Sequence, residues 1–133
     1  MDVNPQKFLL ISIGIAAILV YVPYFVTAYG RLKVGFDPSA PRALFDKLPD
    51  YAKRATWAHQ NSWEVFSLYV AAALMLYASG KADANSSIIA IVFLVARLLF
   101  SIFYIVNIPW LRSPMWLVSI GCVGLLMAKS ITG

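Results

Sequence analysis

Residues 8–30 read FLLISIGIAAILVYVPYFVTAYG, and this stretch decides the fold class of the chain. Tyrosine is the only ionisable residue type in it, and a helix of this length crosses the roughly 30 Å hydrocarbon core of a bilayer. A secretory signal has a shorter apolar core of about 7–15 residues, and no convincing small-residue cleavage site follows here. We therefore expect a retained transmembrane helix.

The same reasoning extends to the rest of the chain. Of all 133 residues, 61% are hydrophobic and only 13% are charged. In soluble domains roughly 45–50% of residues are apolar and about 25% are charged. Further spans are expected at about residues 54–79, 86–106 and 114–128. Only GKADAN, residues 80–85, separates the second from the third, so these two should be antiparallel neighbours. We expect an all-α membrane protein, a single domain over residues 1–133, folded as a four-transmembrane-helix up-and-down bundle.

The charged residues are distributed unevenly between the two sides of this bundle. One side carries Arg31, Lys33, Arg42, Lys47, Lys53, Arg54 and Arg112. The other carries Lys7, Lys81 and Lys129. By the positive-inside rule the first loop should face the cytoplasm, with both termini on the opposite side. The short termini without targeting signals favour a bacterial inner membrane.

The net charge of +5 largely follows from this asymmetry. The chain has no basic stripe interleaved with exposed aromatic residues, so we expect no nucleic-acid partner. Its single cysteine, Cys122, cannot form an internal disulfide, and His59 has no second histidine at a ligand spacing. We therefore expect no metal site, and we interpret both residues as packing or hydrogen-bonding groups.

Prolines mark the expected breaks in the helices. Pro23 should kink the first span and Pro109 should stop the third. The sequence Leu48-Pro49-Asp50 is typical of a helix start, since proline is tolerated in the first turn and an acidic residue there favours the helix dipole. The second helix is therefore expected to begin outside the membrane.

The second span carries a polar stripe at its start. Arg54, Trp57, Asn61 and Glu64 step by 3, 4 and 3 residues and so fall within about 80° of one helix face. Glu64 should lie a turn or more below the interface, where an unpaired carboxylate costs several kcal/mol. It needs a partner, and Arg97 in the third span offers one.

The third and fourth spans add further polar groups on the same side. Tyr104 follows Arg97 by seven residues on the same face, two turns closer to the cytosolic end, and Arg112 opens the fourth helix there. The topology therefore gathers Arg31, Arg54, Asn61, Glu64, Tyr104 and Arg112. Such a pocket suits a small zwitterion with surplus negative charge. The alternatives are a buried Arg97–Glu64 ion pair that fixes helix register, and membrane anchoring by Arg54.

At this point the residues resemble a known family. The pattern R54-A-x-x-A-H59-x-N61-x-x-E64 resembles the second-helix signature of MAPEG proteins, the membrane-associated proteins in eicosanoid and glutathione metabolism. The pair A96-R97 followed by Tyr104 is similar to the family's third helix. Arg112, in PWLRSP, resembles the arginine that several members use toward the glutathione thiol.

The resemblance implies a homotrimer that binds glutathione between neighbouring subunits near the cytosolic face. It also implies a glutathione transferase or peroxidase that acts on lipophilic electrophiles or hydroperoxides. Arg112 would stabilise the thiolate and Tyr104 would donate a hydrogen bond. The residues implied to hold glutathione's carboxylates and amine are Arg31, Arg54, Asn61, Glu64 and Arg97.

Two positions depart from the family pattern. Trp57 stands where several eicosanoid-type members carry an arginine, which predicts weaker binding of a carboxylate, and Ser67 stands near a frequent proline position.

Two other functions remain open. One is a non-catalytic lipid-binding or scaffold protein of the same fold. The other is a small multidrug exporter, which Arg97 and Arg112 disfavour because they would repel a cationic drug.

Overall fold

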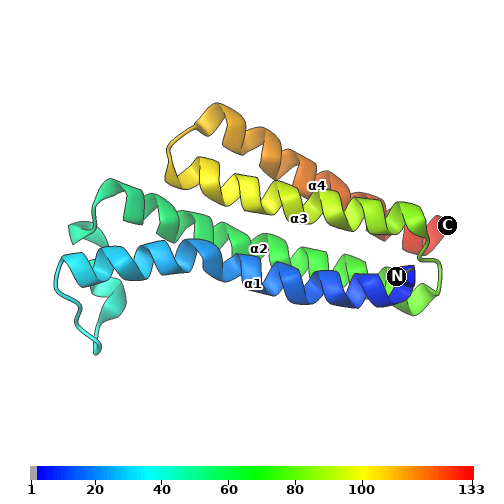
Figure 1. Ribbon diagram of the computed structural model, residues 1–133, viewed down its shortest axis with the longest axis horizontal. Coiled ribbons are helices and arrows are strands. Elements are labelled where there is room, and N and C mark those ends of the chain that lie inside the picture. The colour runs from blue at the N-terminus through cyan, green and yellow to red at the C-terminus, as the bar shows by residue number, and fades with distance from the viewer. Residues whose placement is uncertain (1–2) are drawn as a thin grey trace.

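The computed structural model describes residues 3–133, and over that range the chain is all helical. Its elements are α1 (Pro5–Lys33), η1 (Pro41–Lys47), α2 (Asp50–Ser79), α3 (Ala84–Ile105) and α4 (Pro109–Thr132). The four α-helices are each long and apolar enough to cross a membrane. They run up and down side by side, with both chain termini at one end (Figure 1). The four expected spans and their topology are confirmed.

The two ends of the bundle differ in shape. The end with the termini and the short α2–α3 turn is called the terminal end below. The opposite end, with residues 34–49 and the α3–α4 turn, is called the loop end. At the loop end α1 and α2 extend beyond the α3–α4 turn (Figure 1).

Local sequence explains where the helices begin and end. Asn4 caps α1 through a 2.9 Å hydrogen bond from the Gln6 backbone N–H to its side chain. Asp83 begins α3 with a capping box, in which it accepts from the backbone N–H of Ser86 at 2.9 Å. Gly80 ends α2 at φ 71°, a left-handed conformation that favours glycine.

Pro109 differs from its expected role. It does not simply follow the end of the third helix but occupies the first position of α4, so that helix begins at Pro109 rather than near residue 114. Proline is favoured there because the first helical N–H groups have no partner within the helix. The consequence for the site is that Arg112 lies in the first turn of α4, as expected. Pro23 is buried inside α1, which continues through it.

The buried face of α2 carries small residues near its start and larger ones further along. Ala52 packs so closely on Gly30 of α1 that a methyl group at Gly30 would clash with it. Further along, the fully buried Tyr69 stacks on Phe93 of α3, with ring centroids 3.9 Å apart. The Tyr69 hydroxyl is hydrogen-bonded to Ser12 Oγ at 2.6 Å. These contacts join α1, α2 and α3 into one core.

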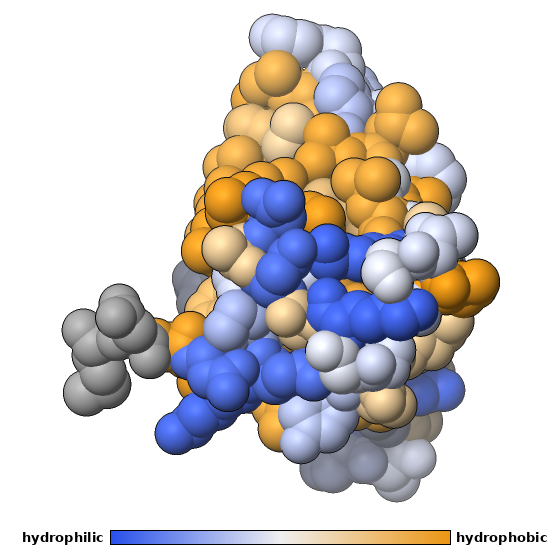
Figure 2. Space-filling view, turned by 90° about the vertical axis from the view of Figure 1, so that its right-hand side faces the viewer, coloured by the Kyte–Doolittle hydropathy of each residue, from blue (hydrophilic) through white to orange (hydrophobic). Residues whose placement is uncertain are grey.

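The outer surface is apolar along the helices and polar at the ends. Figure 2 looks onto the terminal end, where hydrophilic residues gather toward the viewer and apolar residues border them. Large apolar side chains such as Ile18, Phe25 and Leu117 are more than half exposed. This distribution is that of helices whose sides face lipid or other apolar surfaces.

Candidate functional site

A set of polar side chains runs from past the middle of α3 toward the loop end. Its members, called the polar row below, are Arg54, Asn61, Arg97, Tyr104 and Arg112. Arg97 is the most deeply placed and is only 5% exposed. Its Nη2 donates to Asn61 Oδ1 at 2.9 Å and more weakly to Ser62 Oγ at 3.5 Å. Its Nη1 is buried and has no hydrogen-bond partner.

Aromatic rings continue the row from Arg97 to Arg112. The guanidinium carbon of Arg97 lies 4.2 Å from the centre of the Phe100 ring. Phe100 meets Tyr104 edge to face, with ring centroids 5.5 Å apart. The guanidinium carbon of Arg112, from α4, then lies 4.5 Å from the centre of the Tyr104 ring. The structure thus brings Arg97, Tyr104 and Arg112 together, as the seven-residue spacing and the short α3–α4 turn predict.

Arg54 joins the row from α2. Its Nε donates to the backbone carbonyl of Ile105 at 3.0 Å. Ile105 is the last residue of α3, where carbonyl groups lack helical partners and a nearby cation is favourable. Arg54 therefore ties α2 to the end of α3, and no carboxylate contributes to this contact.

The charge of the polar row is not compensated by any carboxylate among the residues that the structure describes. Within residues 3–133 the only ion pair joins Asp83 to Lys129 at the terminal end, and none of Arg54, Arg97 and Arg112 pairs with a carboxylate. A desolvated cation without a counter-charge is unfavourable, above all for the nearly inaccessible Arg97. The row is therefore suited to an anionic ligand.

Glu64 does not take the position that the sequence predicts for it. The expected ion pair with Arg97 is not formed in the described chain, because Arg97 turns to Asn61 instead. Glu64 is exposed on the outer side of α2, whereas Asn61 is half-buried. The carboxylate thus faces outward, where lipid, a ligand or another protein copy would cover it. A helix-register role through an Arg97–Glu64 pair is excluded for the single chain.

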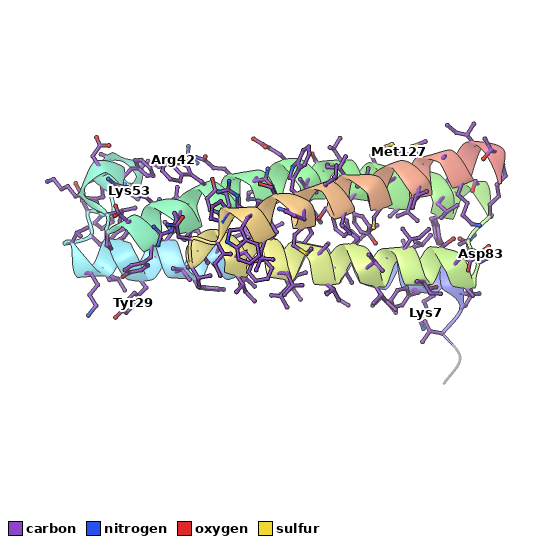
Figure 3. The ribbon with its side chains drawn as sticks, turned by 90° about the horizontal axis from the view of Figure 1, so that it is seen from above. Lys7, Tyr29, Arg42, Lys53, Asp83 and Met127 are labelled. Atoms are coloured by element: carbon purple, nitrogen blue, oxygen red, sulfur yellow. The ribbon has the colours of Figure 1, made fainter. Side chains whose placement is uncertain are left out.

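Arg31 also lies apart from the polar row. It lines a cleft of about 710 Å³ at the loop end, between the end of α1, η1 and the start of α2. Arg42, Phe45 and His59 line the same cleft, and Arg31 Nε is buried there without a hydrogen-bond partner. Figure 3 shows Arg42 and Lys53 at this end, far from Asp83 at the other. A single chain therefore does not bring Arg31 to Arg97 and Arg112.

Phe100 gains a role that the sequence alone did not assign, and His59 keeps the role assigned to it. The Phe100 ring contacts both Arg97 and Tyr104 and so connects them. Its spacing of three residues from Arg97 and four from Tyr104 is the signal that could have identified it. His59 Nδ1 lies 2.8 Å from the Val20 carbonyl, which can only accept, so Nδ1 donates. The interpretation of His59 as a hydrogen-bonding residue is confirmed, and it joins α2 to α1.

A family model described as the MAPEG family matches residues 8–132, nearly the whole chain. No curated protein and no solved structure matches the chain.

Proposed function

Because the chain belongs to the MAPEG family, we propose that it is a membrane-bound glutathione transferase or peroxidase. Its four apolar helices and its family make it an integral multi-pass membrane protein. At the level of the family, membership supports a role in glutathione or eicosanoid metabolism. The support for a transferase or peroxidase activity in particular comes from the polar row.

The observation that carries the proposal is the uncompensated charge of Arg54, Arg97 and Arg112. Glutathione has two carboxylates, one amine and one thiol, so it offers anions to guanidinium groups, which bind carboxylates bidentately. The exposed carboxylate of Glu64 supplies the opposite charge that the amine requires. The charges of the polar row and of Glu64 therefore complement those of glutathione.

The proposed chemistry is activation of the glutathione thiol. A thiol with a pKa near 8.5 is mostly protonated at neutral pH, and an adjacent guanidinium favours the reactive thiolate. In the proposal Arg112 supplies this charge and Tyr104 donates a hydrogen bond to the sulfur. The thiolate then attacks a lipophilic electrophile, so that a carbon–sulfur bond forms and the leaving group departs with its electron pair. The bilayer concentrates such substrates.

The remaining residues are proposed to hold glutathione, with Arg54, Asn61 and Arg97 on one chain. Arg31 lines a separate cleft with residues of α1, η1 and α2, so in the proposal it contributes from another copy. We propose a homotrimer in which Arg31 of the partner subunit reaches the polar row. The outward-facing Glu64 supports this arrangement, because a carboxylate on a membrane helix is rarely left facing lipid. The excess of cations near the loop end supports a cytoplasmic loop end, and we propose a bacterial inner membrane.

The test is a calorimetric titration of the detergent-purified protein with glutathione, together with conjugation assays on a chlorinated aromatic and reduction assays on a lipid hydroperoxide. We expect saturable binding and glutathione-dependent turnover of at least one of these substrates. The absence of both binding and turnover in folded protein would overturn the proposal in favour of a non-catalytic lipid-binding or scaffold protein. A multidrug exporter has the least support, since three guanidinium groups would repel a cationic drug.

A further inference from the structure

The four side chains from Arg97 to Arg112 form a continuous series of contacts, called the aromatic ladder below. Its members are Arg97, Phe100, Tyr104 and Arg112. We propose that the rings of Phe100 and Tyr104 are positioning residues that hold the Arg112 guanidinium in place for the thiolate. This inference rests on the proposed function and gives Tyr104 a role for its ring face in addition to its hydroxyl.

Arg112 needs such a support because nothing else in the described part of the chain holds it. Within residues 3–133 its guanidinium makes no hydrogen bond and no ion pair, and its contact with the Tyr104 ring is the one specific interaction found for it. A long arginine side chain has many rotamers, and fixing one of them costs entropy. The ring contact lowers this cost before any ligand arrives.

The geometry of the contact leaves the guanidinium free to bind. A cation–π contact uses the face of the guanidinium plane, whereas the five N–H donors of arginine point outward along its edges. An ion pair to a carboxylate would instead occupy those donors. The Arg112 guanidinium carbon lies 4.5 Å from the centre of the Tyr104 ring, and within residues 3–133 none of the guanidinium donors is hydrogen-bonded, so they stay available for an anion. The contact is thus compatible with tight binding of a thiolate.

The Tyr104 ring is itself held by Phe100, one turn earlier in α3. Phe100 is only 3% exposed and presents an edge-to-face contact to Tyr104. Its other neighbour is Arg97, which Asn61 fixes by a 2.9 Å hydrogen bond. Residues at 97, 100 and 104 share one face of α3, because steps of three and four residues follow a helix face. The orientation of Arg112 therefore depends on packing that begins near the middle of α3.

The first experiment tests the ladder in the ligand-free protein. Nuclear magnetic resonance in detergent would measure the ring-current shift of the Arg112 δ protons, assigned with Arg112→Lys. We expect upfield signals in the wild type and in Tyr104→Phe, which keeps the ring, and loss of the shift in Tyr104→Leu. Phe103→Leu, a neighbouring ring outside the ladder, is the matched control and should leave the shift unchanged. An unchanged shift in Tyr104→Leu would overturn the inference.

The second experiment measures the consequence for glutathione, by the ultraviolet absorbance of the bound thiolate as a function of pH. We expect Tyr104→Leu to move the midpoint upward by about one pH unit, a roughly tenfold loss of thiolate, as suits the loss of one desolvated cation–π contact. Tyr104→Phe should move it much less, and Phe100→Leu should move it in the same direction as Tyr104→Leu.

The outcomes separate the inference from the proposed function. If Tyr104→Phe shifts the midpoint as far as Tyr104→Leu, the hydroxyl alone acts on the sulfur and the positioning role of the ring is wrong. If the wild type forms no thiolate, the proposed function fails, and the ring-current measurement still decides the ladder. Thermal unfolding of each variant identifies any that fail to fold, and Phe100→Leu then serves in place of an unfolded Tyr104→Leu.

Discussion

The cations at the terminal end and those of the polar row have different partners. At the terminal end Lys129 Nζ lies 2.7 Å from Asp83 Oδ2, and Lys81 Nζ donates to the backbone carbonyls of Ser130 and Ile131. In the polar row Arg97 and Arg112 contact an amide and aromatic rings but no carboxylate. At the terminal end a carboxylate therefore neutralises Lys129 and helix carbonyls bind Lys81, whereas the guanidinium groups of the polar row have no counter-charge within residues 3–133.

This difference distinguishes charged residues that stabilise the fold from charged residues that are suited to binding a ligand. A paired surface cation that also caps helix carbonyls stabilises the fold a little, and nothing further is needed to explain it. A buried or half-buried guanidinium without a counter-charge is a cost to the fold, so its retention points to something outside the chain. Each variant below tests whether a cation or carboxylate belongs to the first kind or the second.

The largest effect is expected from Arg112→Ala. It should reduce glutathione-dependent turnover by about 100-fold or more, because it removes a group that stabilises developing negative charge, while the unfolding temperature should change little. Lys129→Ala is the matched control, since it removes a cation from the terminal end. It should lower the unfolding temperature slightly and leave turnover intact. Equal losses of turnover in both variants would show that the two ends do not differ in function.

Arg97→Met should separate binding from stability. Because Arg97 is nearly inaccessible and has no counter-charge, an apolar side chain of similar length should leave the ligand-free protein as stable as the wild type or more so. Glutathione affinity should fall by roughly 10- to 30-fold, which is the worth of a charge-assisted hydrogen bond. Thermal unfolding and calorimetric titration of the same samples measure the two effects.

The control for Arg97 is Arg97→Lys, which keeps the charge but loses the contact of the guanidinium group with the Phe100 ring. It should bind glutathione better than Arg97→Met does. If Arg97→Met instead unfolds the ligand-free protein, Arg97 is a structural residue like Lys129, and the contrast between the two regions is weakened.

Glu64→Gln should have a smaller effect on binding. The carboxylate is exposed and has no partner within residues 3–133, so the substitution should leave the stability of the single chain unchanged. In the proposal it contacts the glutathione amine, and its loss should weaken affinity by about tenfold or less. A titration with a glutathione analogue that lacks the amine distinguishes the cause: wild type and Glu64→Gln should bind that analogue equally. A remaining difference would place Glu64 elsewhere.

Much of this arrangement could be predicted from sequence, because the rules that set it are local. A membrane helix satisfies its own backbone hydrogen bonds, so an uncharged run such as residues 8–30 indicates a span with little ambiguity. The convergence of Arg97, Tyr104 and Arg112 follows from a seven-residue spacing and a short turn. Both depend on distances along the chain rather than on packing.

The positions of Glu64 and Arg31 could not be predicted in the same way. Helical spacing relates Asn61 to Glu64 but does not say how α2 is rotated about its axis, and both of its faces carry polar residues. The buried face of α2, which includes Ala52 against Gly30, decides that rotation, and Glu64 lies off this face. Phe100 was missed because an aromatic residue in a membrane helix is usually explained by packing alone.

The smallest effect is expected from the ion pair between Asp83 and Lys129 at the terminal end. The Lys129 ammonium, together with the Ser86 backbone N–H, lowers the pKa of Asp83 from 3.8 to about 2. The ionised carboxylate therefore stabilises the folded state above pH 4, and this contribution is lost as the pH falls from about 4 toward 2. Asp83→Asn removes the charge but keeps a side chain that can cap α3, so it isolates the ion pair.

At neutral pH, Asp83→Asn should lower the unfolding temperature by roughly 1–4 °C, since a half-exposed pair contributes little. The difference from the wild type should shrink below pH 4 and vanish near pH 2. Lys129→Gln removes the other partner and should follow the same pH course, because the two variants break one interaction. A difference that persists at pH 2 would mean that Asp83 acts through the helix cap rather than through Lys129. The terminal end would then stabilise the bundle by backbone capping, and its contrast with the polar row would rest on Lys81 alone.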